Sequence, residues 1–269
     1  MLETFTVLQS PPLPSGVFAD VKVLPPKGLN TSVYLDINHF SRETAWAHGF
    51  MHAYALWLGP VLLALAFVVA YTVAWWRRAP RPAVLLVLGG IGTVVSLGFT
   101  QLVAHAAKEL RPFVTHPQAL VLVAKAHDYS FPSDHSVIAG GLTTSLLLIV
   151  GAKVWQRRRG ADHGHTVPEG AGRASIGPAR ALAAVAIVLG LFLCFARIYV
   201  GVHYPGDVVA GYLMSSLVVI LLSLLRPLAY QVLDLVEPTA LGSLFRRPGP
   251  AVTGGVTQAQ AGTSPDAAE

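Results

Sequence analysis

Long apolar runs without charge alternate along the chain with short polar segments that hold its Asp, Glu, Lys and Arg residues. Five runs come close to the length of about 20 residues that an α-helix needs to cross the hydrocarbon core of a membrane. They are Ala53–Trp76, Pro82–Ala107, Ser136–Ala152, Ala181–Ala196 and Val208–Leu225. This pattern predicts an all-α, polytopic membrane helix bundle of about five spans.

The segments outside these runs predict the remaining organisation. The first 31 or so residues are rich in proline and lack the basic start and apolar core of a cleavable signal, so we expect a loose arm. Asn30–Met51 mixes apolar and polar residues in a pattern that fits a helix lying at the membrane interface. Gln156–Pro178 is polar and rich in glycine and is expected to be a flexible loop. We therefore expect an N-terminal arm with an interfacial helix (1–51), a membrane domain (52–230) and a flexible tail (231–269).

Composition narrows the class of protein. Only 12% of the 269 residues are charged and the mean hydropathy is +0.56, which is too apolar for a soluble domain. The net charge of +5 comes from short basic clusters beside the apolar runs. Such clusters orient a membrane protein and do not predict nucleic-acid binding. Cys194 is the only cysteine, so no internal disulfide is possible.

The stretch Arg197–Asp207 places one cation, one imidazole and one carboxylate between the fourth and fifth runs, where charge is costly and usually marks function. Pro205 suits the first position of the next helix, which would put Asp207 in its first turn. There the carboxylate is favoured by the helix dipole and is placed to accept a hydrogen bond from one nitrogen of His203, leaving the other as a nucleophile or base. Taken alone, the stretch also fits an interfacial turn with a snorkelling arginine and a helix-capping aspartate.

A second polar stretch, Phe131–Ser136, opens the third run, with Ser133 or Asp134 placed as the N-cap. Backbone N–H groups at a helix start bind anions such as a phosphoryl group, and His135 would face that site. His127 and Asp128, just before this stretch, fit either a supporting role or an exposed loop.

A third stretch, Lys108–Pro112, follows the second run. Pro112 biases Arg111 away from helical backbone, so the guanidinium is free to turn inward. Two arginines, a lysine, two histidines and a helix N-terminus would then converge. Cations and amides suit the charge of a transferring phosphoryl group, and two imidazoles supply a nucleophile and a general acid.

Together these stretches resemble the motifs of the type-2 phosphatidic-acid phosphatase superfamily, which also contains the vanadium haloperoxidases. Arg197, His203 and Asp207 match the third motif, Pro132 to His135 the second, and Arg111 with Pro112 the end of the first. Asp134 stands where many members have glycine, which most resembles the undecaprenyl-pyrophosphate phosphatase branch. The resemblance covers roughly residues 81–226.

This resemblance implies a hydrolase of phosphoric esters or diphosphates that needs no metal or other cofactor. His203 would be the nucleophile that forms a phosphohistidine, Asp207 would orient it, and His135 would protonate the leaving group. The residues that would hold the phosphate are Arg111, Arg197, Ser133, Asp134 and Lys108.

Two positions depart from the family pattern. Ala196 stands where the third motif usually has serine, and Ala104 stands where the first motif usually has lysine. Positions three and seven before the first motif's arginine lie on nearly the same helix face, so Lys108 would replace the missing lysine. Otherwise His105 or Lys125 would have to neutralise the phosphate.

Basic residues also predict the orientation. Of the 19 Lys and Arg residues, 12 fall on one face of a five-span bundle and 7 on the other. The smaller set consists of Lys22, Lys27, Arg42, Lys108, Arg111, Lys125 and Arg197. The positive-inside rule places the larger set in the cytoplasm. We therefore expect a multi-pass plasma-membrane protein whose three motifs lie on the outer face and whose C-terminus is cytoplasmic.

The sequence thus predicts an integral membrane lipid phosphatase whose partners are the membrane and a lipid phosphate substrate. Undecaprenyl diphosphate is the first choice of substrate, and phosphatidate or another lipid monophosphate is the alternative. A haloperoxidase would hold vanadate with the same residues, but five spans argue against it. A transporter would also carry charges near helix ends and would move anions without releasing phosphate.

Overall fold

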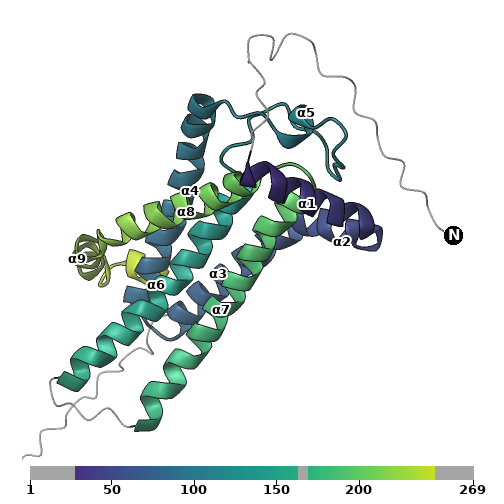
Figure 1. The fold of residues 1–269 in the computed structure, drawn as a ribbon. Coiled ribbons are helices and arrows are strands. Elements are labelled where there is room, and N and C mark those ends of the chain that lie inside the picture. Colours follow the sequence, from purple (N-terminus) through teal and green to yellow (C-terminus); the bar gives the residue numbers. More distant parts are fainter. Residues whose placement is uncertain (1–27, 163–168, 246–269) are drawn as a thin grey trace, which may run out of the picture.

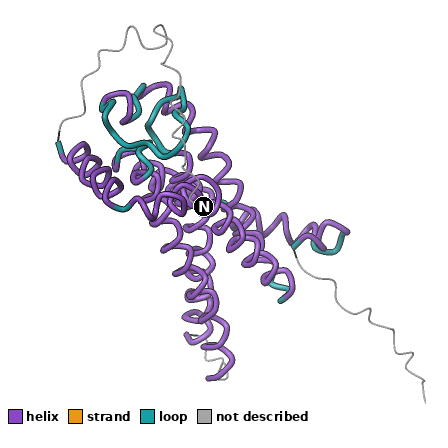
Figure 2. Tube along the Cα trace, turned by 90° about the vertical axis from the view of Figure 1, so that its right-hand side faces the viewer, coloured by secondary structure: helices purple, strands orange, loops and turns teal. Residues whose placement is uncertain are grey.

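The computed structural model describes residues 28–162 and 169–245, which contain helices and no strand (Figure 2). The helices are α1 (Leu29–Glu43), α2 (His48–Ala53), α3 (Gly59–Trp76), α4 (Pro80–Ala107), α5 (Pro112–Thr115), α6 (Asp134–Asp162), α7 (Glu169–Tyr199), α8 (Pro205–Ser223) and α9 (Arg226–Val236). The described chain also contains two short 3₁₀-helices, η1 (Ala45–Ala47) and η3 (Ala240–Leu244), and one π-helical segment, η2 (Tyr54–Leu58). The all-α prediction is confirmed.

Five segments of the described chain are helical, long and apolar enough to cross a membrane, as predicted. They are Ala45–Trp76, Pro80–Thr115, Asp134–Ala152, Gly177–Tyr199 and Pro205–Ser223. The first begins earlier than expected, because η1, α2 and η2 run without a break into α3.

Helix α6 lies at the centre of the bundle and packs against α3, α4, α7 and α8 (Figure 1). A Cβ atom on Gly89 of α4 would lie 2.1 Å from Ser145 Oγ of α6, so only glycine allows this approach. Large apolar side chains such as Val94, Leu102 and Leu213 remain exposed on the outside of the spans. That is the distribution expected where hydrocarbon surrounds the helices.

The predicted helix over Asn30–Met51 is divided in the structure. Helix α1 ends at Glu43, and its polar residues Asn38 and Ser41 are buried against the rest of the protein. The following residues belong to the first span, so the boundary expected at 51/52 falls inside α2.

The prediction of a flexible loop over Gln156–Pro178 is wrong for the described residues of this segment, which are helical. Helix α6 continues to Asp162 and α7 begins at Glu169, so only residues 163–168 lie outside the description. The helix formers Gln, Arg, Ala and Glu in this segment outweigh its glycines.

The expected tail also begins with ordered structure. Helix α9 crosses the boundary predicted at 230/231, and η3 packs back onto α3. Trp75 Nε1 donates to the carbonyl of Ser243 at 2.7 Å, and the Tyr71 hydroxyl donates to the carbonyl of Leu244. Residues 246–269 and the arm over 1–27 lie outside the described chain.

Candidate active site

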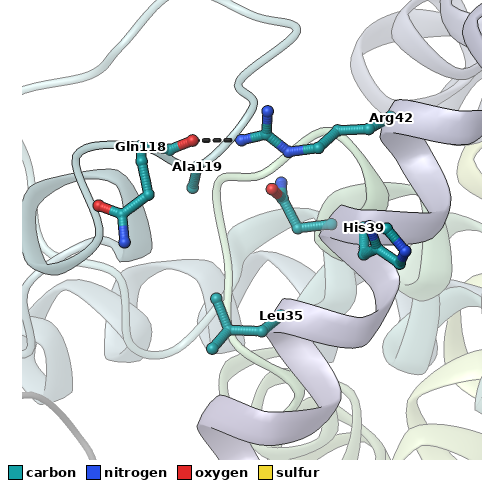
Figure 3. Close-up of a pocket in the computed structure, with 6 residues that line it drawn as sticks. Leu35, His39, Arg42, Gln118 and Ala119 are labelled. Atoms are coloured by element: carbon teal, nitrogen blue, oxygen red, sulfur yellow. Dashed lines mark hydrogen bonds between the residues drawn. The ribbon is translucent and has the colours of Figure 1, made fainter.

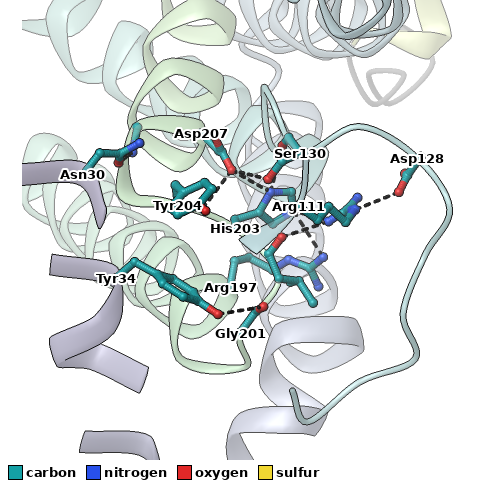
Figure 4. A network of polar contacts seen from close by, with 12 residues as sticks. Asn30, Tyr34, Arg111, Asp128, Ser130, Arg197, Gly201, His203, Tyr204 and Asp207 are labelled. Atoms are coloured by element: carbon teal, nitrogen blue, oxygen red, sulfur yellow. Dashed lines mark hydrogen bonds and ion pairs between the residues drawn. The ribbon is translucent and has the colours of Figure 1, made fainter. Parts of the chain in front are cut away.

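The three motifs meet at one end of the bundle, and Figure 4 shows Arg111 of the first motif beside His203 and Asp207 of the third. Arg111 precedes α5, Asp134 opens α6, and Arg197 lies in the last turn of α7. His203 occupies the turn between α7 and α8, and Asp207 lies in the first turn of α8, after Pro205 as predicted. Residues far apart in the sequence therefore form one polar cluster.

Arg111 has the inward-turned guanidinium that its neighbour Pro112 predicts. Its backbone is extended (φ −65°, ψ 148°) and the residue is 7% exposed. Nε donates to Asp128 Oδ1 at 2.8 Å, and Nη1 donates to the carbonyl of Val202 at 3.1 Å. Two partners thus fix the plane of the guanidinium.

His203 is 3% exposed, and its Nδ1 lies 2.9 Å from the carbonyl oxygen of Ser130. Because a carbonyl can only accept, Nδ1 carries the proton and Nε2 keeps its lone pair. The carboxylate oxygen Oδ2 of Asp207 lies farther from Nδ1, at 3.4 Å. The main orienting partner is therefore the Ser130 carbonyl, where the sequence predicted Asp207.

Asp207 acts on this arrangement through its neighbours. Its Oδ2 accepts hydrogen bonds from Ser130 Oγ at 2.5 Å and from the backbone N–H of Tyr204 at 2.8 Å. The carboxylate of Asp207 therefore binds Ser130, whose carbonyl orients His203, and also binds Tyr204, the residue that follows His203 in the chain.

The free nitrogen of His203 faces two cations. Nε2 lies 3.4 Å from Arg111 Nη1 and 3.5 Å from Arg197 Nη2 (Figure 4). Burial, reinforced by the charges of Arg197 and Arg111, holds the pKa of His203 well below its usual value. The ring is therefore neutral at neutral pH, with the lone pair of Nε2 directed at the two guanidinium groups.

Asp128 is the counter-ion of Arg111. Partial burial alone would raise the pKa of the Asp128 carboxyl, but the hydrogen bond and charge of Arg111 outweigh burial and lower that pKa. Asp128 therefore stays ionised and pairs with the Nε side of Arg111.

Arg197 and Ser133 each carry a buried donor that has no hydrogen-bond partner among the described residues. Arg197 donates from Nη1 to the carbonyl of Ala55 at 3.3 Å, whereas its Nε has no partner. Ser133 is fully buried and its Oγ is also unpartnered. The backbone N–H of Ser133 donates to the carbonyl of Asp207, which joins the start of α6 to the first turn of α8. Unpartnered buried donors of this kind suit the oxygens of a phosphate group.

His135 and Asp134 complete the cluster at its edge. His135 lies against the backbone of Leu56, within electrostatic reach of Arg197 and His203. Both carboxylate oxygens of Asp134 lie 3.5 Å from Gln101 Nε2.

Lys108 is not part of this cluster. Helix α4 ends at Ala107, and Lys108 is exposed in the left-handed conformation (φ 50°, ψ 35°). The expectation that it shares a helix face with the family position at Ala104 is therefore wrong, because no helix continues to Arg111.

Replacing Lys108 by alanine is accordingly expected to leave kcat/KM for phosphate release within about twofold of wild type. The measurement is steady-state phosphate release by the purified variant. A loss of about tenfold or more would mean that this lysine reaches the substrate after all.

Two supporting residues were not assigned by sequence reasoning. Ser130 acts through its carbonyl, which every residue possesses, so nothing in the sequence marks it. Asp128 was left between a supporting role and an exposed loop; it lies in an exposed loop and also accepts a hydrogen bond from Arg111, which favours the supporting role.

A comparison with protein families now identifies the class. A family model described as the PAP2 superfamily matches residues 57–230. The chain therefore belongs to the PAP2 superfamily and is a membrane lipid phosphatase of that family, in agreement with the five helices of its described residues that are long and apolar enough to cross a membrane.

Curated relatives support the same class. The chain is 25% identical over 195 residues to an undecaprenyl-diphosphatase of Sulfolobus acidocaldarius, covering 70% of this chain and 74% of that protein. It is 28% identical over 188 residues to the undecaprenyl-diphosphatase BcrC of Bacillus subtilis, covering 68% and 81%. Among solved structures, a transmembrane PAP2-type phosphatidylglycerolphosphate phosphatase from Bacillus subtilis matches with a TM-score of 0.48 and 19% identity, covering 72% of this chain and 84% of that one.

Proposed function

We propose that the protein removes the terminal phosphate of a lipid diphosphate through a phosphohistidine intermediate, with undecaprenyl diphosphate as the first choice of substrate. The observation that carries this proposal is the neutral imidazole of His203, whose Nε2 faces Arg111 and Arg197 at 3.4 and 3.5 Å. The proposed nucleophile, His203, and the two proposed phosphate-binding residues, Arg111 and Arg197, thus lie together in one buried cluster.

In the first step, Nε2 of His203 attacks the terminal phosphorus. The bond from phosphorus to the bridging oxygen breaks, and protonated His135 gives its proton to that oxygen. Arg111 and Arg197 neutralise the charge spread over the phosphoryl oxygens.

In the second step, His135 accepts a proton from a water molecule that attacks the phosphohistidine. The bond between nitrogen and phosphorus breaks, inorganic phosphate leaves, and both imidazoles return to their starting states. The carbonyl of Ser130 keeps the proton of His203 on Nδ1 in both steps.

Support for a diphosphate comes from the relatives, two of which are named undecaprenyl-diphosphatases. Asp134 in the second motif points the same way by resemblance. A lipid monophosphate such as phosphatidate is the competing substrate.

A substrate panel tests this choice. The purified protein in detergent is given undecaprenyl diphosphate, undecaprenyl monophosphate, phosphatidate and phosphatidylglycerol phosphate, and kcat/KM is measured for each. We expect the highest value for the diphosphate. A higher value for any monophosphate would overturn the choice of substrate, and anion flux in vesicles without phosphate release would favour a transporter.

Phosphate release is also expected to persist in excess EDTA, because the proposed mechanism takes its positive charge from Arg111 and Arg197. No group of three or more His, Cys, Asp or Glu side chains within 28–162 and 169–245 is arranged to hold a metal ion. Complete loss of release in EDTA, restored by magnesium or zinc, would contradict the mechanism.

We further propose that the site faces the outside of the cell and that the C-terminus is cytoplasmic, on the basis of the 12 and 7 basic residues at the two faces. Lys125 is exposed in the loop at the site end and Cys194 is buried. A Lys125→Cys variant should therefore react with a membrane-impermeant maleimide added to intact cells. Labelling only after the cells are opened would reverse the orientation.

A further inference from the structure

Helix α1 lies across the site end of the bundle, close to the loops that carry the motifs (Figures 1 and 4). An interfacial helix would turn its polar side chains to water, yet the polar groups of Tyr34, Asn38 and Ser41 are buried here. Buried polar groups need partners, and those of Tyr34 and Asn38 belong to the loops around the site.

Two residues of α1 form hydrogen bonds with the turn that contains His203. Asn30 Oδ1 accepts from the backbone N–H of Gly206 at 2.8 Å, and so satisfies one of the N–H groups left free at the start of α8. The Tyr34 hydroxyl donates to the carbonyl of Gly201 at 3.3 Å. Gly201 lies two residues before His203 and Gly206 three residues after it, so the turn is held on both sides.

The ring of Tyr34 adds a third contact. It packs edge-on against Tyr204, the residue next to His203, with the ring centroids 5.2 Å apart. Both rings are completely buried. The backbone N–H of Tyr204 in turn donates to Asp207, so this contact reaches the carboxylate of the site.

Two further polar side chains of α1, those of Asn38 and Arg42, bind a second segment. Asn38 Nδ2 donates to the carbonyl of Leu120 at 2.8 Å, and Asn38 Oδ1 accepts from the N–H of Leu120 at 3.0 Å. A few residues away, Arg42 donates to the carbonyl of Gln118 (Figure 3). A pocket of about 340 Å³ lies between these two elements, and its lining residues are Leu35, Asn38, His39, Arg42, Gln118 and Ala119.

This segment is also tied directly to the turn. Leu122 donates from its backbone N–H to the carbonyl of Val200 at 3.1 Å. Gly201 has φ +85°, and a Cβ there would lie 2.2 Å from the carbonyl oxygen of Leu120, so only glycine fits. Hydrogen bonds therefore link the helix, the segment and the turn of His203 to one another.

We propose that Asn30 and Tyr34 of α1 are positioning residues, which hold the turn of His203 so that Nε2 stays between Arg111 and Arg197. This inference rests on the proposed function, since it assigns to α1 the placement of that nucleophile. Within the described chain, no hydrogen bond or ring contact joins Asn30 or Tyr34 to the side chain of His203, so their effect passes through the backbone of the turn.

Four single variants and one double variant test this proposal in the full-length protein. Tyr34→Phe removes only the hydroxyl and keeps the buried ring, and Asn30→Ala removes the acceptor for Gly206. Asn30→Asp keeps an acceptor oxygen at the same place, next to a helix N-terminus that favours negative charge. Asp36→Ala, on the exposed side of α1, is the matched control.

Misplacing a reacting group by about 1 Å can cost about 100-fold in rate, whereas substrate binding by the two arginines would survive. We expect kcat for undecaprenyl diphosphate to fall about fivefold for each single variant and about 30-fold or more for the pair Tyr34→Phe/Asn30→Ala, with KM within about threefold of wild type. Asn30→Asp should recover most of the loss, and Asp36→Ala should match wild type.

All rates are taken on monodisperse protein whose thermal unfolding midpoint is compared with wild type. An unchanged kcat for both Tyr34→Phe and the pair would overturn the positioning role while leaving the proposed function intact. A rise in KM at constant kcat would also overturn it, because it would assign α1 to substrate binding. Absence of phosphate release by the wild-type protein would contradict the proposed function itself, and this inference with it.

Discussion

Replacing His203 by alanine is expected to lower kcat for phosphate release by about 10⁴-fold or more. The reason is chemical, since the proposed covalent intermediate forms on its Nε2. His203 lies in the turn between α7 and α8 and not within a spanning helix, so the helices of the bundle should remain folded in the variant. The measurement is steady-state phosphate release by purified, monodisperse protein.

A matched control is available nearby. His127 is an exposed histidine in the loop that leads into the second motif, and His127→Ala should retain wild-type activity. Activity of His203→Ala within about tenfold of wild type would sink the assignment of the nucleophile.

Loss of Arg111 is expected to have the second largest effect, lowering kcat/KM by about 10³-fold for Arg111→Ala. This guanidinium is fixed by Asp128 and the carbonyl of Val202 and approaches His203 Nε2 at 3.4 Å. It is thus ready to receive a phosphate without reorganisation. Arg111→Lys keeps the charge but loses the planar fork, so it should recover only part of the activity.

Arg180 provides the control for charge removal, because it is exposed near the start of the fourth span, far along α7 from the site. Arg180→Ala should match wild type. If Arg111→Ala kept more than about a tenth of wild-type kcat/KM, the phosphate would have to be held by other cations, with Lys125 the first to examine.

The sequence predicted the spans and the meeting of the motifs because both follow from strong physical constraints. A helix surrounded by hydrocarbon must be long and free of charge, so the runs stand out without any knowledge of packing. The effect of Pro112 on Arg111, and of Pro205 on the start of α8, is equally local. Local rules of this kind can be applied directly to a sequence.

What the sequence did not predict depends on contacts between distant segments or on backbone atoms. The orienting partner of His203 is the carbonyl of Ser130, and a carbonyl leaves no trace in the residue type. Lys108 was placed by assuming that α4 continues, whereas the backbone turns left-handed at that residue. The polar side of α1 was taken to face water, because its partner Leu120 lies 82 residues beyond Asn38 in the chain.

The most direct test of the account is to look for the phosphoryl group on His203. Purified protein is mixed in a single turnover with lipid diphosphate that carries a radiolabel in its terminal phosphate, quenched in alkali to preserve phosphohistidine, digested and mapped. We expect transient label on the peptide that contains His203, and none in His203→Ala. Release of labelled phosphate at the wild-type rate with no labelled histidine at any time, or with the label on another residue, would contradict the mechanism.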